Sequence, residues 1–553
     1  MKIRARARWA AAGVLVLSAG AGNPSRAMAQ DGSSVVIRGL VAAARVPGAR
    51  WPDFARYVDD VARLYAAHGG APVWFGGAAR PDAARAAIRG IDGAASHGLL
   101  PEDYDAVALD SILRAWDSSP PTAGERGRAD VMLSVDLIRY LDDLRRGRTK
   151  GIVASGSITP GAPPDWSNAI GLALDGDSVG ALVDHAGPAL TQYRNLRTLL
   201  ERYRSLAAPP ESAPLSAERP VAPGQFYMEL GELRRRLALL GDLEEDAPVE
   251  DTVYVGTTVE AVQRFQERHG LEPDGVIGPA TLSALNVPLA HRVRQIELAL
   301  ERLRWLPPLG RQPFVVVNIP GFRLFGFDSA GGTGAPSFSS RVVVGRALDT
   351  ETPVLYELMR YTEFRPHWNV PRSILVNEIL PQLGRDPEYL RRHRMEVVGS
   401  ADRSLGDSVT DDVRRRLARG ELRVRQLPGP SNALGLVKFV FPNAASVYMH
   451  DTPDTELFAR SRRDFSHGCI RVEDAAALAV WALRNPVEWG PDQIEAALAG
   501  PGSRRVFLRR PMPVAVVYAT AVATPSGDAW FFADLYGHDR ELDELMRTPP
   551  SPP

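Results

Sequence analysis

The sequence predicts a multidomain α+β protein in which helical segments come first and a mainly β region follows. Apolar residues recur at three- and four-residue steps through residues 35–205 and again through residues 226–286, which is the period of amphipathic helices. From residue 314 onward, short runs of β-branched and aromatic residues are typical of strands. A length of 553 residues corresponds to about three or four domains of ~150 residues each.

The N-terminus has the pattern of a secretory signal. Basic residues between Lys2 and Arg8 precede a short apolar run at residues 9–19, and Ala27-Met28-Ala29 supplies small residues for cleavage before Gln30. We therefore expect residues 1–29 to be removed and the mature chain to lie in the periplasm. The alternative is an uncleaved signal that acts as an anchor, because such apolar runs overlap in length with short spans. No cysteine lies near the cleavage site, which excludes lipoprotein anchoring.

Composition limits the classes of function. A hydrophobic fraction of 45% and a charged fraction of 24% describe an ordinary globular protein. The net charge of −1 gives no argument for binding nucleic acid. The single cysteine cannot form an internal disulfide, so an exported chain would carry a free thiol, and catalysis is one reason to keep it.

Residues 35–205 are expected to form a helical scaffold domain without chemistry of its own. Two of its helical stripes are Phe54-Val58-Val61 and Val131-Val135-Ile138. His97 is interpreted as a loop or capping residue rather than a metal ligand, because no second ligand stands near it. Residues 206–225 are rich in Pro, Ala, Ser and Glu and predict a linker.

Residues 226–286 predict a compact three-helix unit. One stripe contains Leu230, Leu233, Leu237 and Leu240, and a second contains Val259, Val262 and Phe265. Asp274-Gly275 predicts a turn, and Pro279 opens a third helix at its first position. The same pattern would also fit a plain helical bundle that has no binding function. An amphipathic connecting helix is expected at residues 292–305.

Residues 313–540 predict a β domain. Strand-like runs lie at residues 314–319, 322–327, 340–344, 355–364, 436–441 and 446–450, and their spacing suggests a sandwich or a barrel. Residues 513–520 and 530–536 are expected to complete the sheet. No strand-like runs of this kind occur at about residues 373–425, and this interval predicts a partly helical insertion. Residues 541–553 are expected to be a tail.

The only cysteine lies in the segment Ser466-His467-Gly468-Cys469-Ile470-Arg471, and His450 ends the preceding strand. A lone cysteine is most often a small buried hydrophobe. His, Gly and Arg crowd this one, however, and a thiol nucleophile needs a base, a group that orients the base, and donors for an oxyanion. We expect Cys469 on a loop that enters a helix at residues 474–483, where the helix dipole favours the thiolate.

These residues resemble the L,D-transpeptidases, cysteine acyltransferases that cross-link bacterial peptidoglycan. The family has a histidine at a strand end and then a Ser/Thr-His-Gly-Cys-x-Arg/Asn loop, and the 19 residues between His450 and Cys469 suit it. The match continues through Thr352-Pro353, residues 366–371 and residues 429–435. Residues 265–278 similarly resemble peptidoglycan-binding domains. The resemblance is to the large, multidomain periplasmic branch, which implies a β-sandwich catalytic domain with a lid at about 373–425.

The resemblance implies attack by Cys469 on the carbonyl before the terminal D-alanine of a stem tetrapeptide, followed by transfer of the acyl group to an amine. It assigns His450 as the base, with His467 as the alternative. Asp451 or a backbone carbonyl could orient His450. The residues expected at the oxyanion or substrate are Tyr448, Ser466, His467, Gly468 and Arg471, and Arg471 could instead tie the loop down. The acceptor remains open: a second stem, a lipoprotein, a D-amino acid or water.

The resemblance also implies that no cofactor is needed, that the partners are peptidoglycan stem peptides and glycan strands, with other wall-synthesis proteins possible, and that carbapenems acylate the enzyme. Two other classes stay open. His450, His467 and Cys469 carry enough nitrogen and sulfur ligands for a catalytic zinc, although His467-x-Cys469 is tight for one metal. A hydrolytic carboxypeptidase-like enzyme or an inactive wall-binding protein is the further alternative.

Overall fold

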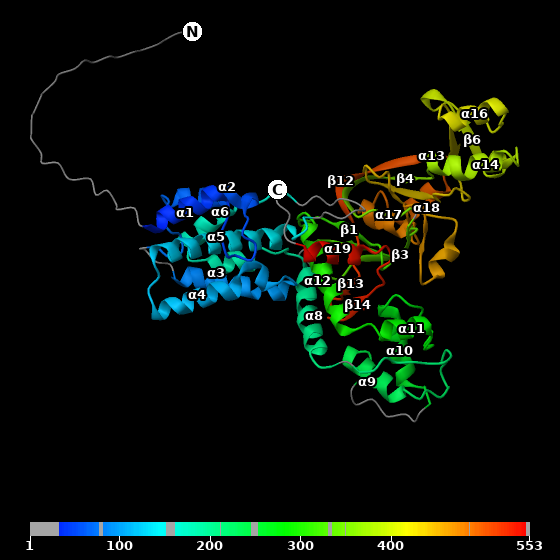
Figure 1. Ribbon diagram of the computed structural model, residues 1–553. Helices are drawn as coiled ribbons and strands as arrows, with labels where there is room; N and C mark the ends of the chain where they lie inside the picture. Colours follow the sequence, from blue (N-terminus) through cyan, green and yellow to red (C-terminus); the bar gives the residue numbers. More distant parts are fainter. Residues whose placement is uncertain are drawn as a thin grey trace, which may run out of the picture.

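The computed structural model describes residues 32–76, 81–150, 161–210, 212–244, 253–329, 334–348, 350–485 and 487–548. Figure 1 shows a helical body at the N-terminal end, a pair of long helices α8 and α12 beside it, a small helical unit, and a β domain that carries a projecting lid. The expected signal segment, residues 1–29, lies outside the described residues. None of the helices in the described ranges has the length and apolar character needed to cross a membrane.

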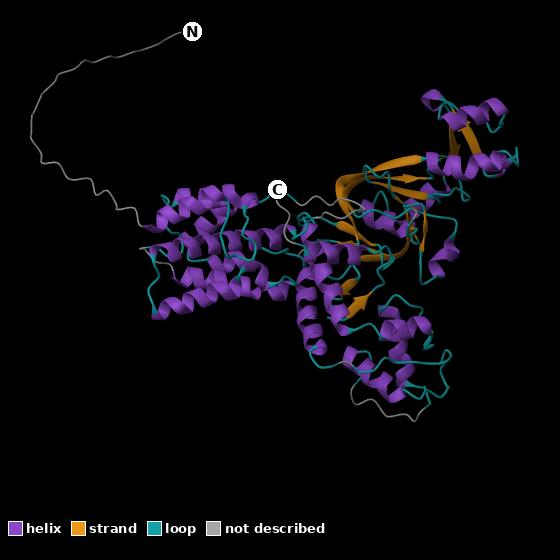
Figure 2. Ribbon diagram, viewed as in Figure 1, coloured by secondary structure: helices purple, strands orange, loops and turns teal. Residues whose placement is uncertain are grey.

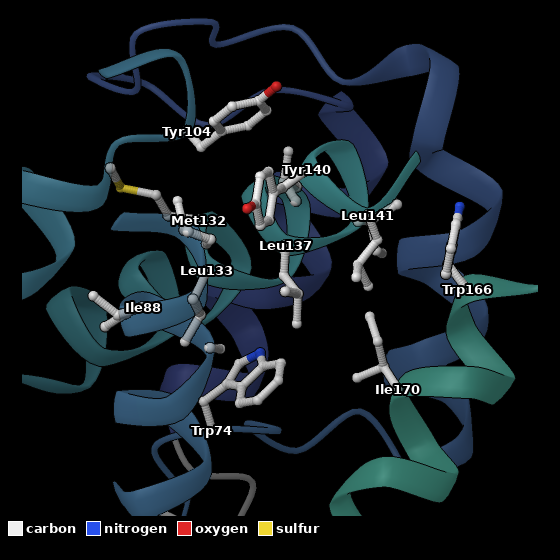
Figure 3. Close-up of a cluster of buried hydrophobic side chains, with 14 of the residues drawn as sticks. Trp74, Ile88, Tyr104, Met132, Leu133, Leu137, Tyr140, Leu141, Trp166 and Ile170 are labelled. Carbon is white, nitrogen blue, oxygen red and sulfur yellow. The ribbon is translucent and has the colours of Figure 1, made fainter. Parts of the chain in front are cut away.

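The N-terminal body is helical, as predicted. Its α-helices are α1 (Gly32–Ala43), α2 (Val58–Ala67), α3 (Pro81–Asp92), α4 (Ala106–Ser118), α5 (Ala123–Arg146), α6 (Trp166–Asp175) and α7 (Val179–Asp184), with short 3₁₀ turns η1 (Ala55–Tyr57), η2 (Gly93–His97) and η3 (Pro101–Tyr104). A capping box between Thr122 and Glu125 starts α5. Buried side chains of α5 form the centre of the core, between Trp74 on one side and Trp166 on the other (Figure 3).

Buried polar groups fix this body. The Asp130 carboxylate accepts the backbone N–H groups of Val73, Trp74 and Phe75 at 2.9 Å each. His97, expected in a loop, ends a 3₁₀ turn and is buried, with Nδ1 2.8 Å from the Tyr193 hydroxyl. Burial lowers the pKa of His97 to about 3, and its role here is structural.

Two long helices join the N-terminal body to the rest of the chain. They are α8 (Thr191–Ala207) and α12 (Leu289–Trp305), and their shared core includes the hairpin β13 (Ala521–Ala523) and β14 (Ala529–Phe531). Helix α8 falls inside the predicted range 35–205, but the core of the helical body ends at Ala186. The expected connecting helix at 292–305 is α12.

The three-helix unit contains α9 (Leu230–Leu240), α10 (Thr257–Arg268) and α11 (Pro279–Leu285), which begins with its proline. The preceding segment, predicted as a linker at 206–225, does more than connect. Leu215 and Val221 are buried in the core of the unit, and Val221 forms an isolated bridge with Ile277. Proline-rich composition therefore did not prevent its few apolar residues from packing.

The β domain contains one nine-stranded sheet in the order β10-β3-β11-β9-β8-β4-β12-β1-β2. Its strands are β1 (Phe314–Asn318), β2 (Arg323–Phe327), β3 (Phe338–Gly345), β4 (Leu355–Phe364), β8 (Val437–Val440), β9 (Met449–His450), β10 (Asp464–Ser466), β11 (Ile470–Val472) and β12 (Arg504–Val517). Strand β2 also pairs with β3, so the ladder closes on itself. The implied sandwich of two separate sheets is thus replaced by the continuous hydrogen bonding of a barrel.

Three helices accompany the sheet: α17 (Ala475–Leu483), α18 (Pro491–Ala499) and α19 (His538–Arg547), with the 3₁₀ turn η6 (Thr455–Ala459). The prediction that residues 530–536 complete the sheet was wrong, because β14 pairs only with β13. Residues 541–547, predicted as a tail, belong to α19. Its Leu542 and Met546 are buried in the core of the β domain.

The insertion is a small domain with its own core. It contains β5 (Trp368–Asn369), β6 (Met395–Val398), β7 (Arg423–Gln426), α13 (Arg372–Ile374), the π-helical turn η4 (Leu375–Ile379), α14 (Leu380–Leu383), α15 (Tyr389–Arg392), the 3₁₀ turn η5 (Ser400–Asp402) and α16 (Asp411–Arg419). Its strands form a separate three-stranded sheet. Figure 2 shows this mixed helical and β unit at the tip of the molecule. The predicted bounds of 373–425 lie just inside it.

Candidate active site

Cys469 lies directly before a strand. Residues 467–469 connect β10 to β11, and α17 begins only after β11, with Asp474 capping it. The expectation that Cys469 enters a helix was therefore wrong, since three strand residues separate them. Hydrogen bonding to the neighbouring strand, and not a helix terminus, fixes its position.

The register of two parallel strands brings the predicted residues together. Strand β11 pairs with β9 so that Ile470 lies opposite Met449 and Arg471 opposite His450. Met449 and Ile470 are fully buried in the core. Because successive side chains of a strand point to opposite faces, His450 and Arg471 lie on the other face. Extending the register by one residue places Cys469 opposite Tyr448 on that same face.

The main chain orients His450. Its Nδ1 donates to the Asp451 backbone carbonyl at 2.5 Å, which leaves the lone pair on Nε2. The Asp451 carboxylate instead accepts the backbone N–H of Leu436 at 2.7 Å, and it lies against Gly435. Of the two orienting groups that the sequence left open, the structure places the backbone carbonyl on the imidazole.

Burial keeps both reactive groups neutral. It raises the pKa of the Cys469 thiol, although the hydrogen bonds from Tyr448 and the charges of Lys438 and Arg471 oppose the shift. Burial likewise lowers the pKa of His450 to about 3. Both shifts favour the uncharged forms, a thiol and a neutral imidazole. The expectation of a thiolate stabilised by a helix dipole is corrected accordingly.

Tyr448 and Lys438 complete this face. The Tyr448 side chain interacts with the Cys469 thiol and with the Trp368 side chain, and burial is the main cause of its raised pKa. Lys438 lies opposite His450 on β8, with Nζ 3.8 Å from the centre of the Tyr448 ring. Burial lowers the pKa of Lys438. Sequence reasoning missed Lys438, although the alternation of residues 437–440 could have placed it on the face opposite the core.

The loop around Cys469 is held by its own hydrogen bonds. The Ser466 hydroxyl donates to the Cys469 carbonyl at 2.5 Å and accepts the Gly468 N–H at 3.1 Å. Gly468 has a φ of 102°, which side chains rarely adopt. Ser466 therefore shapes the loop, and it occupies the Gly468 N–H that was expected to face an oxyanion.

The other two predicted residues contact acidic partners. His467 is exposed, and its Nε2 lies 2.8 Å from Oε1 of Glu378, a lid residue on η4. Arg471 donates from Nη1 to Asp454 at 2.8 Å. Of the two roles considered for Arg471, the structure shows the tie within the domain. His467, predicted at the oxyanion or substrate, contacts the lid through Glu378 in this structure.

Thr352 and Tyr536, which lie far from Cys469 in the sequence, support the loop through hydrogen bonds. The Thr352 hydroxyl donates to the Gly468 carbonyl at 2.9 Å and accepts the Gly345 N–H at 2.8 Å. The Tyr536 hydroxyl donates to the Gly345 carbonyl at 2.6 Å and accepts the Thr352 N–H at 3.3 Å. Thr352 was part of the recognised pattern, whereas no local motif marks Tyr536.

Within the described ranges, no three His, Cys, Asp or Glu side chains come close enough together to hold a metal ion. His467 is directed to the lid and His450 to its own backbone, so the three proposed zinc ligands do not form a group.

Three family models match the chain. Residues 312–497 match the L,D-transpeptidase catalytic domain, residues 59–200 a scaffold domain, and residues 229–285 a putative peptidoglycan binding domain. Residues 312–497 form an L,D-transpeptidase catalytic domain. The family resemblance found in the sequence is thereby confirmed. The L,D-transpeptidase match stops before β12, which belongs to the nine-stranded sheet, and before α19, whose buried residues pack in the core of the β domain.

A curated relative supports the same family. A protein from Haemophilus influenzae described as a putative L,D-transpeptidase is 31% identical over 250 residues, which are 45% of this chain and 49% of the relative. The match thus spans about half the length of that relative. Among solved structures, an L,D-transpeptidase (residues 123–326) from Xylanimonas cellulosilytica has 15% identity, covers 55% of this chain and all of its own, and has a TM-score of 0.17.

Proposed function

We propose that the chain is a cysteine-dependent L,D-transpeptidase that cross-links peptidoglycan. The observation that supports this mechanism best is the shared sheet face of Cys469, Tyr448 and His450, with Nδ1 of the imidazole already bonded to a carbonyl. That bond leaves Nε2 as the one nitrogen able to accept the thiol proton. A general base needs this arrangement before its pKa matters.

In the first half-reaction, Nε2 of His450 takes the thiol proton as the sulfur attacks the carbonyl between the third and fourth stem residues. The imidazolium then gives this proton to the leaving nitrogen, the C–N bond breaks, and D-alanine departs. A thioester on Cys469 remains. In the second half-reaction, an amine of another stem loses a proton to His450 and attacks the thioester. The C–S bond breaks, and the thiolate recovers the proton.

The oxyanion formed in each half-reaction needs positioned donors. The Tyr448 hydroxyl is one, since Tyr448 lies beside Cys469 on the paired strands and interacts with the thiol. The Cys469 N–H is a second candidate. The Gly468 N–H could contribute only after leaving Ser466.

The remaining units fit a wall enzyme. The three-helix unit would hold peptidoglycan, and the secretory signal would deliver the chain to the periplasm. A carbapenem presents a strained carbonyl to Cys469 and should acylate it. The zinc alternative is not favoured, because its three ligands are directed to different partners.

The test is incubation of the purified chain with a disaccharide-tetrapeptide, followed by mass spectrometry. We expect a cross-linked dimer that lacks one D-alanine, in the presence of EDTA as well as without it. Cys469→Ala is the control and should give no product. Loss of D-alanine without a dimer would indicate a hydrolase, and restoration by zinc of activity lost in EDTA would contradict the thiol mechanism.

A further inference from the structure

A row of mostly charged side chains crosses the sheet from the thiol site to β12, on the face opposite the core. Strand pairing sets its order, because residues directly opposite each other on neighbouring strands share a face. From β11 to β12 the members of the row are Arg471, His450, Lys438, Glu363 and Arg505. The residues that alternate with the central members are fully buried in the core, namely Met449, Phe439 and Thr362. Lys438 therefore lies on the same face as His450 and Cys469, one strand away from His450.

Lys438 has no ion pair among the residues that the structure describes. Its neighbour Glu363 is engaged elsewhere, since its carboxylate accepts the Ser503 hydroxyl at 2.9 Å and lies 3.9 Å from Arg505. Glu363 acts on Lys438 only as a more distant charge. An ammonium has three N–H donors, and this one is half-buried, where burial disfavours its charge. An anion brought to Lys438 would therefore be bound favourably.

The Tyr448 ring lies between this ammonium and the thiol. Nζ of Lys438 is 3.8 Å from the ring centre, and the Tyr448 side chain interacts with the Cys469 thiol. Burial lowers the pKa of Lys438, and the charges of Glu363 and Cys469 oppose this shift, so the ammonium is within electrostatic reach of the sulfur. A ring face attracts an ammonium, but a carboxylate is the stronger partner, because it accepts charge-assisted hydrogen bonds. Lys438 thus holds a positive charge about one aromatic ring away from the reacting atom.

The substrate of the proposed reaction has a carboxylate at a matching position. In a stem tetrapeptide a single residue follows the attacked carbonyl, and the carboxylate of that residue is three bonds from the carbonyl carbon. We propose that Lys438 binds this terminal carboxylate and thereby selects donor stems that end one residue after the attacked bond. The inference rests on the proposed function, since it concerns the same thiol site. A stem extended by one residue presents an amide to Lys438 in place of the carboxylate, and the charge pair is lost.

The test compares two donor substrates with the purified chain. One is a disaccharide-tetrapeptide whose terminal D-alanine is the free acid, and the other carries D-alaninamide there, with all other carboxylates unchanged. Mass spectrometry of the released D-alanine or D-alaninamide gives kcat/KM. We expect wild type to favour the acid about 10- to 100-fold, since the amide forms no charge-assisted hydrogen bond. Lys438→Met should lower kcat/KM for the acid by a similar factor and keep that for the amide within about threefold, so that the preference disappears.

Two further variants separate this role from a structural one. Lys438→Arg keeps a positive charge able to pair with a carboxylate, and it should retain a preference for the acid of at least about fivefold. Arg505→Met removes a positive charge from the same face, two strands beyond Lys438, and should keep the wild-type preference.

An equal loss for acid and amide in Lys438→Met would overturn the proposal, because a lysine that acts only through Tyr448 or through the fold affects both substrates alike. A wild-type preference below about twofold would overturn it without any variant, which covers a Lys438→Met chain that does not fold. Release of neither product by wild type would contradict the proposed function instead. Calorimetric binding of the two compounds to Cys469→Ala then decides: equal affinities overturn the assignment, and tighter binding of the acid that is lost on adding Lys438→Met supports it.

Discussion

His450 takes its orientation from the backbone carbonyl of Asp451, while the Asp451 carboxylate holds the Leu436 N–H. Asp451→Asn keeps an oxygen acceptor for that N–H and leaves the imidazole contact untouched. We therefore expect the variant to keep kcat within about fivefold, whereas loss of a carboxylate that orients a histidine costs about 10⁴ in kcat. The steady-state rate of D-alanine release measures kcat.

His450→Ala provides the comparison for Asp451→Asn and should lose nearly all turnover, as should Cys469→Ala. A loss for Asp451→Asn approaching that of His450→Ala, in a variant with an unchanged circular dichroism spectrum, would mean that the carboxylate turns to the imidazole during catalysis.

Burial of Cys469 sets its reactivity with pH. The folded-state pKa of this thiol is raised, so the thiolate forms at a higher pH in the folded chain than in the unfolded chain. We expect the rate of iodoacetamide alkylation to rise with a midpoint above that of the same chain in guanidinium chloride. The single cysteine makes the measurement unambiguous, because every adduct counted by mass spectrometry is at position 469. A folded midpoint below the unfolded one would instead indicate a thiolate–imidazolium pair.

Residue types and spacing were enough to bring forward Cys469 and His450 as candidates. They could not identify the group on Nδ1, because a backbone carbonyl leaves no trace in sequence. Lys438 was missed for a related reason. Its approach to Tyr448 depends on the pairing of β8 with β9, which is a tertiary contact.

The lid touches the catalytic loop through Glu378 and His467. This pair is largely exposed, and such contacts contribute roughly 0.2–1 kcal/mol. Glu378→Gln should therefore favour the open lid only modestly and speed acylation of Cys469 by a carbapenem by about 1.5- to 5-fold. Intact-protein mass spectrometry over time gives the rate.

Glu388→Gln is the matched control for the lid, since Glu388 pairs with Arg391 inside the lid itself. It should leave the acylation rate unchanged. Equal rates for wild type, Glu378→Gln and Glu388→Gln would show that the contact between η4 and the loop does not limit access.

The segment after the family match supports the site through Tyr536. Tyr536→Phe removes the bonds to the Gly345 carbonyl and the Thr352 N–H, and Thr352 holds the Gly468 carbonyl. With about 1 kcal/mol for each bond, we expect kcat to fall roughly 5- to 30-fold with little change in KM. Tyr227→Phe, in the three-helix unit, serves as the control. A fall in stability without a change in kcat would assign Tyr536 to the fold alone.

For the secondary-structure elements, the sequence predicted where strands occur better than it predicted which strands pair with each other. The strand periods at 314–364 and 436–450 placed the strands of the sheet, because alternation follows directly from a buried face. Residues 530–536 have the same alternation, yet only Trp530 and Phe531 belong to a strand, and that strand pairs with β13 and packs in the core shared with α8 and α12. Residues 541–547 were taken for part of a tail although they belong to α19, because this helix is mostly charged and has only three apolar residues, Leu542, Leu545 and Met546.

Helix α12 joins the scaffold to the rest of the molecule through a buried charge cluster. The Glu301 carboxylate accepts the Thr149 N–H at 2.9 Å and the Arg304 guanidinium at 2.9 Å. Arg304 in turn donates to the His97 carbonyl and to the Tyr193 hydroxyl. Glu301 and Arg304 are both fully buried. The two regions of the scaffold that contain His97 and Thr149 are therefore tied to one turn of α12.

Glu301→Gln tests this connection, because it keeps the shape of the side chain and leaves Arg304 buried without an anion. Removing one partner of a buried pair typically costs about 3–5 kcal/mol, so we expect the first urea transition at neutral pH to lose stability of that order.

Burial alone would raise the pKa of Glu301, but Arg304 and the N–H groups of Thr149 and Arg148 outweigh it and lower the pKa. A lowered folded-state pKa means that the stabilisation is complete above the unfolded value of about 4.3 and is lost as pH falls through the folded value. The difference between wild type and variant should therefore be largest at neutral pH and shrink steadily below about pH 4.3. Glu388→Gln, in an exposed pair, should stay within about 0.5 kcal/mol of wild type throughout. A difference for Glu301→Gln that is equally small, or that does not vary with pH, would show that the cluster does not hold the scaffold to α12.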